Sequence, residues 1–142
     1  MAKKILVING PNLNLLGERE LEIYGKMTLK EIEERIKDFA HNKDLEVEWF
    51  QSNHEGEIVE KIQQVRGCFD GIIINPAALS YTSYSILDAL KAVNLPSIEV
   101  HVSNIFSRQD FRKNSVTASA CLGIISGFGW KGYLYALMDL IS

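Results

Sequence analysis

Short runs of apolar residues alternate along the chain with segments of helical periodicity, and this alternation constrains the fold more than any other feature. The runs predict five strands, at residues 5–8, 45–50, 71–74, 98–102 and 122–125. We interpret the pattern as a strand–helix unit repeated five times. Continuous apolar strands and right-handed crossovers then predict an α/β, flavodoxin-like three-layer sandwich. Its five-stranded parallel sheet is expected to have the order 2-1-3-4-5.

Local signals predict where the helices begin and end. Thr28, with Glu31 three residues later, has the pattern of a capping box. Ser52 or Asn53 is expected to cap the second helix, and Gly67 is expected to close it. The remaining helices are predicted at residues 83–93 and from about residue 130.

Length and composition fit a single domain spanning residues 1–142. A hydrophobic fraction of 46% provides enough apolar side chains for a core, which excludes a disordered chain. Lys and Arg total 15 against 18 Asp and Glu, a net charge of −3, which argues against a binder of nucleic acid or acidic membranes. The uncharged stretches contain Asn, Ser and Pro and do not have the character of a membrane span.

The two cysteines, Cys68 and Cys121, lie far apart in the sequence and form no C-x-x-C motif. We therefore interpret them as reduced thiols in the core of a cytoplasmic protein. The start of the chain is also unlike a secretory signal, because Lys3 and Lys4 are followed by only four apolar residues before Asn9.

Polar residues gather where the predicted strands end, which is where ligands bind in folds of this class. Asn12 follows the first strand, and a lid loop at about residues 18–27 contains Arg19 and Tyr24. Asn75 follows the third strand. The region of the fourth strand adds Glu99, His101, Ser103, Arg108 and Arg112. This polar, cationic and aromatic set suits a small polyol or carboxylate ligand.

The sequence lacks the residues that other functions of this fold class require. A phosphoacceptor receiver domain needs acidic residues where Asn9 and Asn75 stand. The segment after the first strand is neither a P-loop nor a G-x-G-x-x-G motif, which argues against a nucleotide or flavin site. The histidines, His41, His54 and His101, form no zinc motif, so we expect no metal.

Two pairs of residues suggest specific chemistry. Glu99 and His101 lie two positions apart in a strand, so their side chains share one face, where a carboxylate would orient the imidazole and favour its cation. The amides of Asn12 and Asn75 follow adjacent strands and are suited to bind a substrate oxygen or a water molecule that stabilises an enolate. Each Asn is equally suited to close an Asx turn, and both interpretations stay open.

Several long motifs resemble the type II 3-dehydroquinate dehydratases over nearly the whole chain. They include Asn-Gly-Pro-Asn-Leu-Asn-Leu-Leu-Gly at residues 9–17, Gln-Ser-Asn-His-Glu-Gly at 51–56 and Glu-Val-His-Val-Ser-Asn at 99–104. The shorter matches lie at residues 19–20, 24–25, 75–76, 108, 111–112 and 127–129. The resemblance implies a shikimate-pathway hydro-lyase of aromatic amino acid biosynthesis that converts 3-dehydroquinate to 3-dehydroshikimate. It implies an anti elimination through an enolate, with no cofactor, metal or Schiff base, in a cytoplasmic dodecamer built as a tetramer of trimers.

The resemblance also implies roles for individual residues. Tyr24 would be the base, with Arg19 stabilising its ionised form, and His101 would be the acid, oriented by Glu99. Asn12 would complete the catalytic set. The residues implied to bind substrate are Asn75, Tyr81, Asp88, Val102, Ser103 and Arg112, with Asp88 approaching the site of a neighbouring subunit.

Several positions keep a second interpretation or depart from the family. Tyr24 could instead anchor the loop, Asp88 could be an ordinary exposed acid, and Arg108 could be a lid residue or a surface charge. Tyr81 stands where the family has a substrate-binding histidine, and Ala77 replaces a glycine. The alternative function is therefore a non-catalytic binder of a cyclic polyol carboxylate on the same scaffold.

Overall fold

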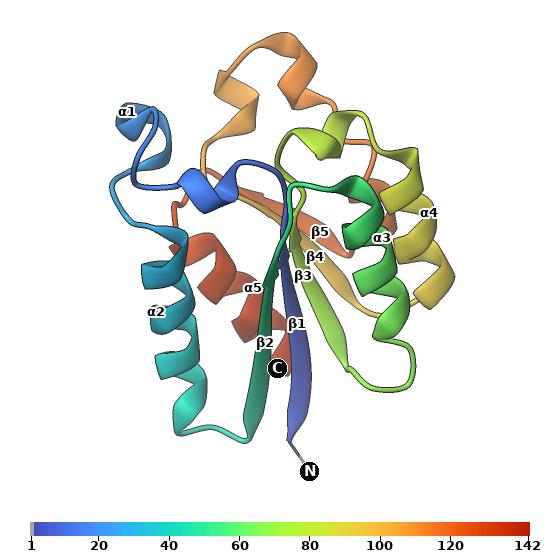
Figure 1. The fold of residues 1–142 in the computed structure, drawn as a ribbon. Helices are drawn as coiled ribbons and strands as arrows, with labels where there is room; N and C mark the ends of the chain where they lie inside the picture. The colour runs from blue at the N-terminus through green and yellow to red at the C-terminus, as the bar shows by residue number, and fades with distance from the viewer. Residues whose placement is uncertain (1) are drawn as a thin grey trace.

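The computed structural model describes residues 2–142 and contains one five-stranded sheet (Figure 1). The strands are β1 (Lys3–Asn9), β2 (Leu45–Gln51), β3 (Gly71–Asn75), β4 (Ser97–His101) and β5 (Gly123–Ser126). All neighbouring strands are parallel, and their spatial order is β2-β1-β3-β4-β5. The predicted fold class and strand order are confirmed.

Helices cover both faces of this sheet, as Figure 1 shows: α2 and α5 lie on one face, α3 and α4 on the other. Their bounds are α1 (Leu21–Tyr24), α2 (Leu29–His41), α3 (Glu55–Gln64), α4 (Tyr84–Val93) and α5 (Lys131–Ile141). No α-helix joins β4 to β5 in the described chain, so the prediction of five complete strand–helix units is wrong. That connection contains three short 3-10 helices instead, because its sequence is polar and lacks an apolar stripe.

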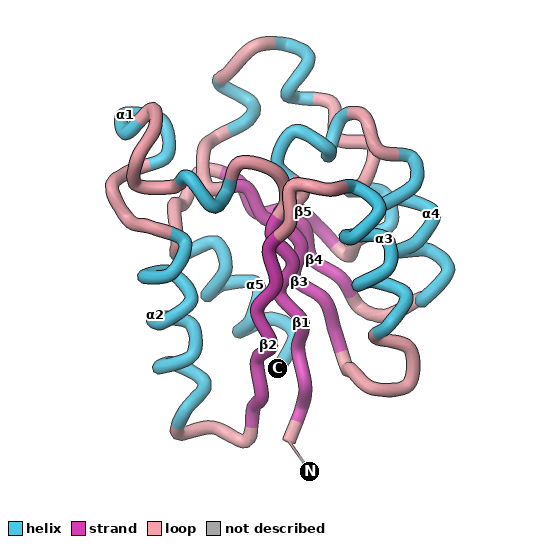
Figure 2. Tube along the Cα trace, viewed as in Figure 1, coloured by secondary structure: helices cyan, strands magenta, loops and turns pink. Residues whose placement is uncertain are grey.

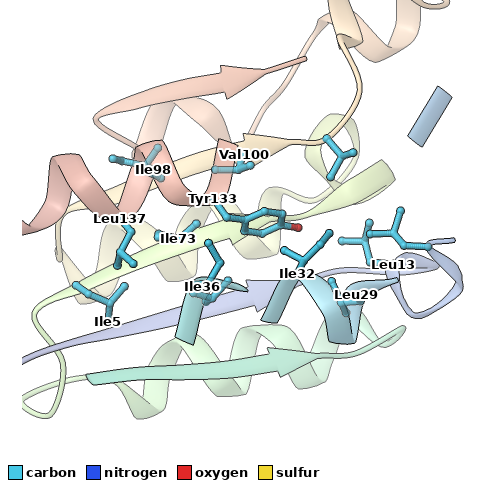
Figure 3. Close-up of a cluster of buried hydrophobic side chains, with 14 residues drawn as sticks. Ile5, Leu13, Leu29, Ile32, Ile36, Ile73, Ile98, Val100, Tyr133 and Leu137 are labelled. Atoms are coloured by element: carbon cyan, nitrogen blue, oxygen red, sulfur yellow. The ribbon is translucent and has the colours of Figure 1, made fainter. Parts of the chain in front are cut away.

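Two apolar cores follow from the alternation of side chains along the strands. Ile5 and Val7 of β1 pack with α2 and α5, whereas Leu6 and Ile8 pack with α3 and α4. Tyr133 of α5 lies fully buried in the first core, close to the side chains labelled with it in Figure 3. Its hydroxyl is polar and must find partners there.

The helix starts agree only in part with the local signals. The capping box of Thr28 and Glu31 is present at α2, as predicted. The predicted cap of α3 is wrong: His54 occupies that position, while the Ser52 hydroxyl accepts a bond from the His54 N–H and donates to Glu57. Gly67 does not close α3, which ends at Gln64; the glycine lies in the turn that follows, with φ of +75°.

The bounds of β4 and β5 and the burial of the two cysteines differ from the predictions. β4 and β5 each lie one residue away from their predicted ranges, so Val102 follows β4 instead of ending it. Both cysteines are free thiols, but Cys68 is exposed and Cys121 half-buried, so neither lies in the core. Burial, and then the charge of Glu99, raises the pKa of the Cys121 thiol to about 12. Within residues 2–142, each helix is too short or too polar to cross a membrane.

Candidate active site

A cavity of about 150 Å³ lies at the carboxyl ends of β1, β3 and β4. The long connections gather at this edge of the sheet, at the top of Figure 2. The predicted site residues that line the cavity are Asn12, Arg19, Tyr24, Asn75, Tyr81, His101, Val102, Ser103 and Arg112. Arg108 lines the cavity too, although the sequence does not distinguish a lid residue from a surface charge at this position. Residues from four separate stretches of chain therefore converge on one small space.

Tyr24 ends the short helix α1 within the predicted lid loop and lies beside two cations. The Cζ atom of Arg19 lies 4.7 Å from the centre of the Tyr24 ring, and that of Arg108 lies 5.1 Å from it. Arg19 also donates to Glu20 at 2.6 Å, while its buried Nε has no hydrogen-bond partner in the described chain. Arginine keeps its charge near neutrality, so the Tyr24 ring lies beside two permanent cationic groups.

His101 and Glu99 form a buried pair at the end of β4. The Nε2 atom of His101 lies 2.7 Å from Oε2 of Glu99, and both side chains are buried. A carboxylate accepts only, so Nε2 carries the proton of this bond. The bond leaves Nδ1 as the nitrogen of His101 that can serve a ligand in the cavity. Glu99 itself is not among the residues that line the cavity.

Sequence reasoning missed two hydroxyl groups that complete the surroundings of Glu99. Ser115 donates to Oε2 at 2.7 Å, and Thr117 donates to Oε1 at 2.5 Å. Both lie in the connection between β4 and β5. No spacing in the sequence links them to Glu99, because only the tertiary fold brings this connection against β4.

Asn75 has both ends of its amide engaged. Its Oδ1 accepts from the Ala77 N–H at 3.1 Å, which is the Asx turn, and its Nδ2 donates to the Tyr133 hydroxyl at 3.0 Å. Tyr133 in turn donates to Oδ1 of Asn9 at 2.7 Å. One Nδ2 hydrogen of Asn75 remains for a ligand. Sequence reasoning missed Tyr133, which lies 58 positions from Asn75 along the chain.

Asn12 adopts a left-handed backbone conformation with φ of +71°, and its N–H donates to Oδ1 of Asn53 at 2.9 Å. Asn tolerates this region better than most residues do. Asn53 also accepts from Nε2 of Gln51, whose amide donates to the Gly10 carbonyl as well. The loop that carries Asn12 is therefore fixed by neighbours from the β2 end.

The cavity lining also includes Tyr81 and cationic groups. Nη1 of Arg112 lies 3.4 Å from the Tyr81 hydroxyl, and the Tyr81 ring meets Phe111 edge-on at 5.2 Å between centres. Arg108 donates to the Ser103 hydroxyl at 3.2 Å. These donors create an environment that attracts an anion such as a carboxylate.

Asp88 is the one predicted substrate-binding residue that lies away from this cavity. It is exposed on α4 and does not line the cavity of its own chain. Within residues 2–142, no three His, Cys, Asp or Glu side chains are grouped so that they could hold a metal ion.

Comparison with known proteins gives one consistent result. A family model described as dehydroquinase class II matches residues 3–141. The 3-dehydroquinate dehydratase of Clostridium botulinum is 54% identical over 138 residues, covering 97% of this chain and 94% of that protein. The type II dehydroquinase of Butyrivibrio crossotus has a TM-score of 0.97 with 49% identity over 99% of both chains. That of Propionibacterium acnes has a TM-score of 0.93 with 40% identity, covering 100% of this chain and 99% of that one.

Proposed function

The chain belongs to the class II dehydroquinase family, and we propose that its cavity dehydrates 3-dehydroquinate to 3-dehydroshikimate by anti elimination through an enolate. Family membership makes the chain a hydro-lyase. The observation that carries the mechanism is that Tyr24 lies beside two guanidinium groups in the cavity that His101 also lines. Glu99 lies behind His101 and forms a buried pair with it.

Tyr24 is the base of the proposed reaction. A free phenol is ionised in only about one molecule in a thousand at pH 7. Arg19 and Arg108, each about 5 Å from the ring centre, are the cationic groups proposed to stabilise tyrosinate during the reaction. Tyrosinate removes the proton from the carbon beside the ketone, and the electron pair of the C–H bond moves into the enolate.

His101 is the acid of the second step. The enolate electrons form the ring double bond as the C–O bond breaks, and imidazolium donates its Nδ1 proton to the departing hydroxyl, which leaves as water. Glu99 stabilises the cation through Nε2. Tyr24 gains one proton and His101 loses one, so exchange with solvent restores both groups.

The remaining polar groups bind the substrate and the enolate. Asn12 and the free Nδ2 hydrogen of Asn75 are available to donate to the enolate oxygen or to a water molecule beside it. The substrate carboxylate is proposed to bind the backbone at Val102 and the Ser103 hydroxyl. Arg112 and Tyr81 are proposed to bind ring hydroxyls.

Replacing Tyr24 by Phe tests the mechanism, because this change removes only the phenol oxygen. We expect kcat to fall by at least about 100-fold, as for loss of a general base, while substrate still binds. Formation of the conjugated product in the near ultraviolet measures turnover, and calorimetry measures binding. Tyr135→Phe is the matched control, because it keeps the apolar ring on α5 and removes only an exposed phenol oxygen. Turnover near that of the unmodified chain would refute the role of Tyr24.

We further propose that the catalytic unit is the whole of residues 1–142, with residues 18–27 as its lid, and that copies of the chain assemble. Assembly would bring Asp88 of one copy towards the cavity of the next, where it would bind substrate. A cytoplasmic location, where thiols stay reduced, suits the two free cysteines.

A further inference from the structure

The Glu99 carboxylate is fully buried and surrounded by hydrogen-bond donors from two parts of the chain. His101, on the same strand, contacts Oε2 at 2.7 Å. Ser115 contacts the same oxygen at 2.7 Å, and Thr117 contacts Oε1 at 2.5 Å. Neither hydroxyl lines the cavity, so neither is placed to meet substrate.

The two hydroxyl groups have their protons committed to Glu99. Ser115 Oγ accepts from the Ala118 N–H at 3.1 Å and lies 3.2 Å from Thr117 Oγ1. A hydroxyl carries a single proton, and a carboxylate accepts without donating. With both protons directed at Glu99, neither hydroxyl donates to the other. The pattern is complete when Glu99 is ionised and every donor points at it.

We propose that Ser115 and Thr117 are positioning residues that hold the Glu99 carboxylate in place with two hydrogen bonds and thereby fix the protonated nitrogen and orientation of His101. This inference rests on the proposed function, in which His101 is the acid. An ionised Glu99 holds the proton of neutral His101 on Nε2, leaving Nδ1 free towards the cavity. The two hydroxyls also share the negative charge of Glu99, which moderates how strongly the pair attracts a further proton.

The backbone around Thr117 links this network to the cavity wall. The N–H groups of Val116 and Thr117 lie 2.6 and 3.4 Å from the carbonyl oxygen of Ser80, a residue that lines the cavity. Thr117 itself is fully buried. The hydroxyl is therefore held rigidly, as a positioning role requires.

The other ionisable groups near the pair are not replaced in the proposed variants. Those that line the cavity with His101 are Arg19, Tyr24, Tyr81, Arg108 and Arg112. The Cys121 thiol lies on the side of Glu99, whose charge acts on it. A shift caused by changing Thr117 alone can therefore be assigned to the lost hydroxyl.

Thr117→Val removes one donor while keeping the shape of the side chain. Without the hydrogen bond from Thr117, the negative charge of the Glu99 carboxylate is less stabilised, so the His101–Glu99 pair takes up a proton more easily. We expect the midpoint of its titration to rise by roughly half to one pH unit. The measurement is ¹⁵N NMR of the imidazole rings in the full chain without substrate. Assignment uses His41→Gln and His54→Gln. The corresponding limb of the kcat profile is expected to move by the same amount.

The control variants separate positioning from mere stability. Thr117→Ser restores the hydroxyl and is expected to restore the midpoint. Ser119→Ala, on the same turn but without contact to Glu99, is expected to leave it unchanged. If Thr117→Val lowers the melting temperature but leaves the midpoint and the Nε2–H form unaltered, the proposal is wrong. Should that variant not fold, Ser115→Ala removes the other hydroxyl donor to Glu99, and the same shift of the titration midpoint is expected.

One further variant distinguishes failure of this inference from failure of the mechanism. His101→Ala with undiminished kcat would remove the acid role of His101. The imidazole titration is recorded without substrate, so it would still report whether Thr117 controls the pair. An altered midpoint with unaltered kcat would support the network and refute its use in the reaction.

Discussion

At the scale of single residues, Ala77 is held in an energetically unfavourable backbone conformation. Its φ is +53°, in the left-handed region, and its N–H closes the Asx turn with Asn75. This conformation costs a residue with a Cβ atom roughly 1–2 kcal/mol of folded-state stability, whereas glycine adopts it without that cost. The strain persists because the turn and the cavity wall fix the backbone.

Ala77→Gly is therefore expected to stabilise the chain. Glycine removes this strain of roughly 1–2 kcal/mol but loses about 0.4–1 kcal/mol through the greater freedom of the unfolded chain, so the net gain in the free energy of unfolding is at most about 1.6 kcal/mol. Urea unfolding measures the free energy. Ala78→Gly, at a neighbour without positive φ, is the control and should destabilise. Equal losses in both variants would contradict the assignment of strain.

Pairs of residues were predictable from sequence only where local geometry decides. Glu99 and His101 are linked by the two-residue period of a strand, and their contact is present. Ser115 and Thr117 could not be found, because a hydroxyl residue in a polar connection resembles any other. Arg108 was left open for a similar reason: an arginine can reach far, and only the fold shows that Tyr24 lies within that reach.

At the scale of elements, local signals succeeded where the backbone of the element itself is the partner. The capping box of α2 involves only Thr28 and Glu31, and it formed as predicted. The cap of α3 failed because the Ser52 hydroxyl has other partners, the His54 N–H and Glu57. A capping residue is identified from sequence only while nothing else competes for its side chain.

Tyr133 joins three elements through its hydroxyl. It links α5 to Asn9 of β1 and to Asn75 of β3, all buried. Tyr133→Phe leaves an amide oxygen and an amide hydrogen without partners, so we expect a loss of about 1–3 kcal/mol at pH 7. Urea unfolding measures this loss, and Tyr135→Phe, which is exposed, is the control and should change little.

The effect of Tyr133 has a defined pH dependence. Burial raises its pKa well above the ordinary range, so the folded phenol stays protonated. The unfolded chain releases this proton near pH 10, which favours unfolding above that pH. Tyr133→Phe has no such proton to lose. The stability difference between the two proteins should therefore narrow as pH rises past about 10, and a constant difference would contradict the argument.

At the scale of the whole molecule, the topology was predictable because parallel strands, short connections and right-handed crossovers leave few arrangements. The surface was less predictable, because an apolar residue at an interface resembles one in the core. Several large apolar side chains are exposed on β5 and α5 or next to them: Leu122, Phe128, Tyr135 and Met138. β5 is also an edge of the sheet, so among residues 2–142 only one of its sides is paired with another strand.

These features suit the proposed assembly. Leu122 and Tyr135 line one groove, and the Tyr135 ring meets Phe128 at 5.8 Å between centres, so the apolar groups are contiguous. Contiguous exposed apolar surface of this kind marks an interaction site. We expect the chain to sediment as an oligomer, and Leu122→Lys to shift it to smaller species. At 69% exposure, Leu122 contributes little to the core, so the fold itself should survive.

Sedimentation velocity with a parallel assay of turnover tests both the assembly and Asp88. Leu15→Lys, an exposed leucine before the lid, is the matched control and should leave the oligomer intact. If assembly supplies Asp88 to a neighbouring cavity, dissociation should raise KM in step with the loss of oligomer. A chain that sediments as a monomer while fully active would show that one copy completes the site, because Asp88 lies outside the cavity of its own chain.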